Sequence, residues 1–241
     1  MGASGGPSIV HDNLVLGLEA ADKNSYIGSG TTWSDLSPNG NDGTLSAAAI
    51  GTVSSSLKTM AFNGSSTYVD CGTGASITDS GLGHSESSIF LWINASNYGD
   101  EAAIISSGTD ETNGSLIAGR SSTTIRVDQN YGDKYYIEDS DAAVTANTWQ
   151  YIGYTMVSSS GVGPTLTAYS NGTNRLMGSV GTDVSGVAEA GATGNFIIGR
   201  RQWAAESYIK GSISAVQVYN RALSLKEIQQ NFNAQRSRFG V

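Results

Sequence analysis

The feature that most constrains this chain is a series of short apolar or alternating segments separated by turn signals. About a dozen such segments recur along the chain, with Gly, Asn and Ser between them. Residues 88–93 are apolar at nearly every position, which is typical of a strand covered on both faces. The pair Asn63-Gly64, between residues 59–62 and 67–70, predicts a hairpin. We therefore predict an all-β sandwich or barrel rather than alternating strands and helices.

The composition supports this prediction and restricts the function. The 241 residues include 31 glycines, and only 14% are charged, against roughly 25% in an average soluble domain. The net charge is −8, and no basic cluster exceeds Arg200-Arg201 and the Arg236/Arg238 pair, so we expect neither nucleic acid nor an anionic membrane as a partner. No run approaches the roughly 20 apolar residues that span a bilayer. The single cysteine, Cys71, excludes an intrachain disulfide and is expected to be a small buried side chain.

The chain shows no linker or internal repeat that would divide it. Residues 1–8 are small and predict a flexible arm, and residues 9–241 predict a single domain. Ser224 and Glu227 have the spacing of a capping box, and Leu225, Ile228 and Phe232 follow at helical spacing. One short amphipathic helix is therefore expected near the C-terminus. The first residues lack a secretory signal, so we expect synthesis in a cytoplasm.

Several segments, in order, carry a family resemblance. They are W-S-D-L-S-P-N-G-N-D-G-T-L at 33–45, F-N-G at 62–64 with Y-V at 68–69, I-F-L-W-I at 89–93, N-T-W-Q-Y-I at 147–152, A-Y-S-N-G at 168–172, F-I-I-G at 196–199 and G-S-I-S-A-V-Q-V-Y-N-R-A-L-S at 211–224. From residue 9 to about 235 the chain resembles laminin-G-like, or concanavalin-A-like, lectin and glucanase domains. The resemblance implies an all-β jelly-roll sandwich of two antiparallel sheets, whose concave or loop-edge face often binds glycans, sometimes with Ca²⁺.

The opening of the chain narrows the resemblance. Residues 9–21, followed by G-S-G-T-T-W at 28–33, are similar to domains of tailed-bacteriophage virion proteins. This implies a capsid decoration, head-fibre or tail-fibre protein on the virion surface, made in the host cytoplasm. Its expected partners are other virion subunits, host-surface glycans or both, and a homo-oligomer is expected. The alternatives are a glycan-binding adhesin and a carbohydrate-binding module of a larger system.

Two groups of residues are candidate binding sites. Aromatic rings in predicted loops can stack on sugars, and we select Trp203, Tyr98, Tyr131 and Tyr208, while Trp92 and Trp149 are assigned to the core. One loop also supplies the oxygen ligands that Ca²⁺ prefers, from Asp35, Asn39, Asn41 and Asp42. The alternative for that loop is a turn in which these side chains satisfy backbone amides while Trp33 and Leu36 fill the core.

No catalytic motif emerges from the sequence. The E-x-D-x-x-E strand of related glycosidases is absent, and so are H-E-x-x-H, G-x-S-x-G and the phosphate-binding loop. The acidic pairs Asp100-Glu101, Asp110-Glu111 and Glu138-Asp139 are interpreted as solvated loops rather than as the two carboxyl groups of a glycosidase. We therefore expect a non-enzymatic protein.

Overall fold

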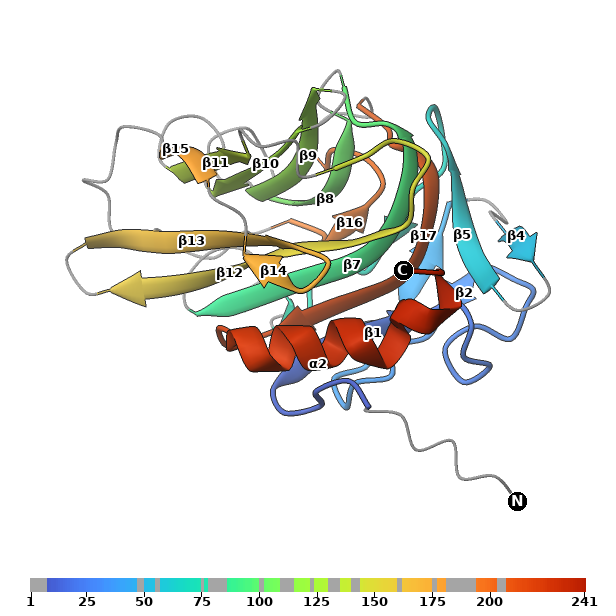
Figure 1. The fold of residues 1–241 in the computed structure, drawn as a ribbon. Coiled ribbons are helices and arrows are strands. Elements are labelled where there is room, and N and C mark those ends of the chain that lie inside the picture. The colour runs from blue at the N-terminus through green and yellow to red at the C-terminus, as the bar shows by residue number, and fades with distance from the viewer. Residues whose placement is uncertain are drawn as a thin grey trace.

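The chain folds into two layers of antiparallel strands with a helix outside one layer (Figure 1). The computed structural model describes residues 8–46, 50–54, 57–74, 76–77, 86–99, 102–108, 115–121, 124–129, 135–139, 144–159, 162–174, 177–180, 194–202 and 207–241. Within these ranges one short α-helix lies near the C-terminus, so the predicted all-β sandwich is confirmed. None of the described helical residues form a span long and apolar enough to traverse a bilayer.

Sheet A and sheet B are the two layers. The described strands of sheet A, in spatial order, are β14 (Thr173–Asn174), β13 (Val162–Ser170), β12 (Gln150–Ser159), β7 (Ser87–Asn97), β17 (Lys210–Tyr219), β5 (Leu57–Asn63) and β4 (Ile50–Ser54), with β1 (Leu14–Glu19) also paired to β17. Those of sheet B are β15 (Met177–Val180), β11 (Tyr135–Asp139), β10 (Thr124–Gln129), β9 (Ser115–Ser121), β8 (Ala103–Ser107), β16 (Ile197–Ile198), β6 (Val69–Asp70), β3 (Gly43–Leu45) and β2 (Thr32–Trp33).

Strand β7 shows how sheet A is buried on both faces. Alternate side chains of a strand point to opposite faces. Ile89, Leu91 and Ile93 enter the core between the sheets, whereas Phe90 and Trp92 enter a second apolar cluster on the other face. All five side chains are fully buried, which confirms the expectation for residues 88–93. Sheet A is thus the middle layer of the molecule.

The second cluster is an aromatic layer between sheet A and the C-terminal residues. Trp92 stacks on Phe239 with ring centroids 4.0 Å apart and on Phe232 at 5.7 Å. Trp149 meets Phe239 at 4.9 Å. Figure 1 shows α2 (Leu225–Gln235) along sheet A on the face away from β8 to β10. The assignment of Trp92 and Trp149 to the core is confirmed.

Helix α2 begins where the capping box predicts. The Ser224 hydroxyl accepts a hydrogen bond from the Glu227 amide, and the Glu227 carboxylate accepts one from the Ser224 amide. The chain then continues through a 3₁₀ turn, η1 (Arg236–Arg238), to Gly240, whose φ of +72° is left-handed. The start of the helix therefore follows its local sequence signal, whereas the helix ends at Gln235 with Arg236 in a right-handed conformation, before Gly240 is reached.

The buried face of α2 differs from the predicted apolar stripe. Leu225 is 45% exposed, whereas the buried positions are Ile228, Asn231 and Gln235. The prediction for Leu225 is wrong because it counted apolar residues alone, and two of the three buried positions are amides. Those amides find partners on sheet A, so their burial is compensated by hydrogen bonds.

Asn231 is the centre of a buried polar network. Its side-chain amide group donates to the Tyr219 hydroxyl at 2.9 Å and to Gln217 Oε1 at 3.3 Å. Its oxygen accepts from the Val10 amide at 2.7 Å, and the Tyr219 hydroxyl donates to the Val10 carbonyl. The Tyr151 hydroxyl also donates to Gln217. Burial raises the pKa of Tyr219 and Tyr151, which keeps both hydroxyls protonated as donors.

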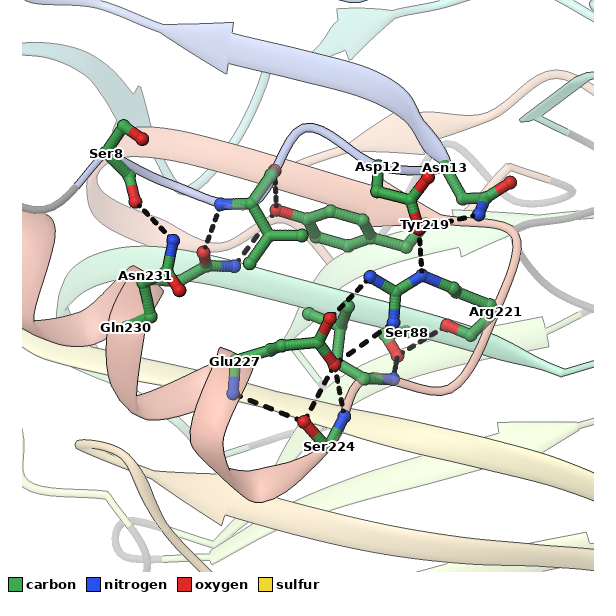
Figure 2. Close-up of polar contacts among 12 residues, drawn as sticks. Ser8, Asp12, Asn13, Ser88, Tyr219, Arg221, Ser224, Glu227, Gln230 and Asn231 are labelled. Atoms are coloured by element: carbon green, nitrogen blue, oxygen red, sulfur yellow. Dashed lines mark hydrogen bonds and ion pairs between the residues drawn. The ribbon is translucent and has the colours of Figure 1, made fainter.

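Further polar contacts join the start of the chain to α2 (Figure 2). Gln230 donates to the carbonyl of Ser8, the last residue of the predicted arm. Arg221 bridges Asp12 and Glu227 with ion pairs of 3.2 and 2.6 Å. Residues 1–7 lie outside the described ranges, so the flexible arm and the domain boundary at residue 9 stay predictions.

One predicted hairpin is wrong. β5 and β6, which flank Asn63-Gly64, lie in different sheets. Asn63 Oδ1 accepts hydrogen bonds from the amides of Ser65, Ser66 and Thr67, so this side chain organises a loop that carries the chain from sheet A to sheet B. The Asn-Gly signal marked a turn correctly but not the pairing of its flanks.

Candidate functional site

The outer face of sheet B offers polar side chains where β3 and β6 pair. Thr44 lies opposite Asp70 in the register, and Leu45 lies opposite Val69. Leu45 and Val69 are buried in the core between the sheets. Thr44 and Asp70 must therefore point outward, and so must Tyr68, which lies two residues before Asp70 in an extended segment.

An open groove of about 580 Å³ lies over this pair of strands. The non-glycine side chains that line its described part are Asn41, Asp42, Thr44, Ser46, Tyr68, Asp70, Cys71, Thr73 and Asn195. They come from the β2–β3 loop and from β3 and β6 with their flanking residues. Asn195 comes from the segment just before β16. The groove thus combines one aromatic ring with a mostly polar lining of amides, hydroxyls and carboxylates.

Hydrogen bonds fix the polar groups at the centre of the groove. Asn195 Nδ2 donates to both carboxylate oxygens of Asp70, at 2.9 and 2.8 Å, and the Gly72 amide donates to one of them at 2.8 Å. The Arg200 guanidinium lies 4.2 Å from the centre of the Tyr68 ring. The groove is therefore held in shape before any ligand enters, which reduces the entropy lost on binding.

The glycine at the start of β3 allows the two strands to pack. A β-carbon on Gly43 would lie 2.5 Å from Val69 Cγ1, closer than any real contact. Its neighbour Trp33 is fully buried in the core between the sheets, as one of the two interpretations of this loop expected. Leu36 is 38% exposed, however, so its expected burial is wrong.

Asp35 accepts hydrogen bonds from the chain itself on both carboxylate oxygens. Oδ1 accepts from the amides of Gly17 and Ser37, each at 2.8 Å. Oδ2 accepts from the Ser37 hydroxyl at 2.6 Å and the Asn41 amide at 2.9 Å. The bond from Gly17 ties the loop to β1, and the other three stabilise the turn itself.

The other predicted calcium ligands are used in a similar way. Asp42 Oδ1 accepts from the Asp35 amide, and the Asn41 side chain donates to the Val15 carbonyl and exchanges hydrogen bonds with Ser76. Asn39 presents its NH₂ group to the Leu14 carbonyl. Among the described residues, no three His, Cys, Asp or Glu side chains converge on one point. The donor set does not fit a calcium ion held by all four residues, and calcium binding stays an untested prediction.

The predicted aromatic site residues do not gather in one place. Tyr98 follows β7 in a loop, as expected, but it is fully buried in the core between the sheets, so its assignment to a sugar-binding surface is wrong. Burial raises the pKa of its hydroxyl to about 12. Tyr208 is half-buried, pairs with Ala103 through an isolated bridge and does not line the groove. Trp203 and Tyr131 lie outside the described residues.

Sequence reasoning found Asn41 and Asp42 of the groove but missed Tyr68, Asp70 and Asn195. A local signal for two of them exists. Val69 is an apolar residue between Tyr68 and Asp70, and strand alternation sends the two flanking side chains to the face opposite Val69. Asn195 carries no such signal, because the hydrogen bond to Asp70 joins residues 125 positions apart.

Cys71 forms part of the groove floor and is a free, buried thiol, as expected. Burial raises its pKa first, and the negative charges of Asp70, Asp35 and Asp42 raise it further. The thiol therefore stays protonated and unreactive at neutral pH. The same carboxylates make the floor of the groove electronegative.

Comparison with known proteins assigns the fold to a family. The family model of the concanavalin A-like lectin/glucanases superfamily matches residues 63–229, well over half of the chain. The chain therefore belongs to this superfamily, as the resemblance read from its motifs implied. A search of curated protein sequences found no match.

Solved structures share the fold at low sequence identity. The sialidase of Trypanosoma rangeli bound to the inhibitor DANA matches with 15% identity and a TM-score of 0.64, over 93% of this chain and 33% of the sialidase. Domain 4 of AbnA, an extracellular arabinanase of Geobacillus stearothermophilus, in complex with arabinotriose, matches with 15% identity and a TM-score of 0.61, over 92% of this chain and 98% of that domain. The binding domain of Paraclostridial Mosquitocidal Protein 1 matches with 17% identity and a TM-score of 0.67, over 93% and 52%.

These likenesses bear on the fold alone. The chain spans about a third of the length of the sialidase, so the activity of that whole enzyme is not transferred with the shared domain. The fold is nevertheless that of a superfamily of lectins and glucanases, and the groove on sheet B brings polar and aromatic groups of the described residues together.

Proposed function

We propose that this protein is a non-enzymatic glycan-binding protein and that the groove over β3 and β6 is its binding surface. The observation that carries the proposal is the placement of the Tyr68 ring beside amides, hydroxyls and carboxylates in an open groove of about 580 Å³. A sugar offers an apolar ring face together with hydroxyl groups at its rim. The Arg200 guanidinium covers one face of the Tyr68 ring, 4.2 Å from its centre, so we assign the sugar contact to the other face or the edge of the ring, beside the polar neighbours.

The hydrogen bonds of the groove support binding without turnover. A retaining or inverting glycosidase needs one carboxyl group to donate a proton and a second to act as nucleophile or base. Asp70 is engaged by Asn195 and Gly72, and Asp42 is engaged by the amide of Asp35. We assign these carboxylates to holding the groove in shape and to contacting sugar hydroxyls.

The setting that we propose is the surface of a tailed-phage virion, with other virion subunits and host glycans as partners. Its support is the resemblance of residues 9–33 to virion proteins. Mass spectrometry of purified particles of a phage that encodes this chain tests the setting, and absence of the chain from those particles would refute it. Size-exclusion chromatography tests the expected homo-oligomer.

A second setting is a carbohydrate-binding module of a larger system. It is favoured by the match to domain 4 of the arabinanase, because the match covers 98% of that domain. Both settings use the same groove, so the binding experiment is common to them.

A glycan array followed by calorimetry tests the binding function. We expect Tyr68→Ala to weaken the strongest array hit about tenfold, which corresponds to about 1.4 kcal/mol. Tyr68→Phe is the matched control, because it keeps the ring and should retain the affinity. Trp203→Ala tests the residue favoured from the sequence.

Three outcomes would count against the proposal. Wild-type protein that binds no glycan on the array would refute it, and so would affinity that does not change in Tyr68→Ala. Release of reducing ends from any polysaccharide by the wild-type protein would refute the non-enzymatic assignment.

A further inference from the structure

The charges around the groove are unevenly distributed. Asp42 and Asp70 line it, and Asp35 lies directly behind Asp42, whose carboxylate accepts the Asp35 amide. All three act on the Cys71 thiol at the floor, where they raise its pKa after the larger effect of burial. Two carboxylates thus line the space that a ligand would fill, and a third lies behind them.

Among the described residues, one cation, Arg200, contacts a side chain that lines the groove. The described lining residues of the groove include no Lys, Arg or His. Arg200 lies over the Tyr68 ring, and its Nη1 already donates to the carbonyls of Arg201 and Gln202. A single cation offsets only part of the field, and the net charge of −8 of the whole chain has the same sign as the three carboxylates.

Because like charges brought together at a binding surface oppose association, this arrangement discriminates between ligands of different charge. We infer that the groove selects neutral oligosaccharides and rejects saccharides that carry a carboxylate or sulfate group. This inference rests on the proposed function and names the ligand class of the same site. Acidic saccharides should bind about tenfold more weakly than the neutral saccharides with the same core, since each carries a charge into a field of equal sign.

Two substitutions change the charge of the groove with little effect on its structure. Asp42→Asn removes one negative charge while the Asn oxygen can still accept the Asp35 amide. Thr44→Lys adds a positive charge at an exposed position of β3 that faces outward. Asp22→Asn is the matched control, because Asp22 also accepts a backbone amide, that of Asn24, and does not line the groove.

The experiment uses an array on which neutral oligosaccharides stand beside their sialylated, sulfated and uronic-acid forms. The best matched pair is then measured by calorimetry at about 0.05 M and 0.5 M NaCl, because salt screens charges beyond a Debye length of roughly 10 Å at 0.1 M. We expect the wild-type protein to prefer the neutral form, the preference to shrink in Asp42→Asn and at high salt, and to shrink further or reverse in Thr44→Lys. Asp22→Asn should behave as wild type.

Each remaining outcome overturns a different statement. Equal binding of both forms, or a preference for the acidic form, by the wild-type protein overturns the charge selectivity and leaves the glycan-binding function intact. A neutral preference that persists unchanged in both Asp42→Asn and Thr44→Lys overturns the assignment of selectivity to the groove. Binding of neither form refutes the proposed function together with this inference.

Discussion

The layer beneath α2 and the groove on sheet B are both rich in polar side chains, but they differ in what those side chains contact. Under α2, Asn231, Gln217 and Tyr219 are buried and donate or accept entirely within the protein. In the groove, Asp42 and Thr44 are exposed and only part of their hydrogen-bonding capacity is used by the chain. The comparison separates polar groups that hold the fold from polar groups that are available to a ligand.

The difference follows from the cost of desolvation. A buried amide without a partner loses about 1–3 kcal/mol, so the residues under α2 persist only as a connected set. The groove residues keep contact with water and exchange it for sugar hydroxyls at small cost. Substitutions in the first region should therefore change stability, and substitutions in the second should change binding.

The largest effect is expected for Asn231→Ala. It leaves Tyr219, Gln217 and the Val10 amide each without one buried partner, so the free energy of unfolding should fall by about 3 kcal/mol. Denaturant unfolding measures this change. Asn233→Ala, at an exposed position of the same helix, should change stability by less than about 0.5 kcal/mol. If the two variants were equally stable, or if Asn231→Ala altered glycan affinity while folded, the proposed separation of roles would be wrong.

An intermediate effect is expected for Asp35→Ala, because Asp35 both stabilises the fold and shapes the groove. The carboxylate accepts four hydrogen bonds that shape the groove wall, and their loss should cost about 2 kcal/mol of stability and weaken binding as well. Thermal unfolding with and without Ca²⁺ or EDTA separates the two interpretations of this loop. A turn held by its own hydrogen bonds predicts equal Tm values for the wild type under both conditions, whereas a rise in Tm with Ca²⁺ that Asp35→Ala abolishes would establish a calcium site.

The smallest effect concerns Glu227 at the start of α2. The hydrogen bond from Arg221, opposed in part by desolvation and aided by Ser224, lowers the pKa of Glu227 from 4.5 to about 2. A carboxyl group whose pKa is lower in the folded state stabilises the protein at pH values above its pKa in the unfolded state. This contribution is lost as the pH falls from about 4.5 towards 2. Both partners are partly exposed, so the loss should be small. Stability measured across this pH window should fall less steeply in Glu227→Gln than in the wild type or in Asp22→Asn, and parallel curves would contradict the assignment.

Several parts of the molecule were predictable because their signals are local. The doubly apolar residues 88–93 required cover on both faces, and the structure supplies the second sheet on one side and the aromatic layer on the other. Ser224 and Glu227 set the start of α2 through atoms only three residues apart. Trp33, Trp92 and Trp149 are buried as expected, because burying a large ring removes much apolar surface from water.

The tertiary structure alone decided which segments became neighbours. Strand alternation states that Tyr68 and Asp70 share a face, but only the pairing of β6 with β3 and the contact with Asn195 turn that face into a groove. In the same way, the Asn63-Gly64 signal specifies a turn while the division of β5 and β6 between two sheets depends on long-range packing. Side-chain periodicity fixes the direction in which a residue points, and free energies summed over distant contacts determine what it meets there.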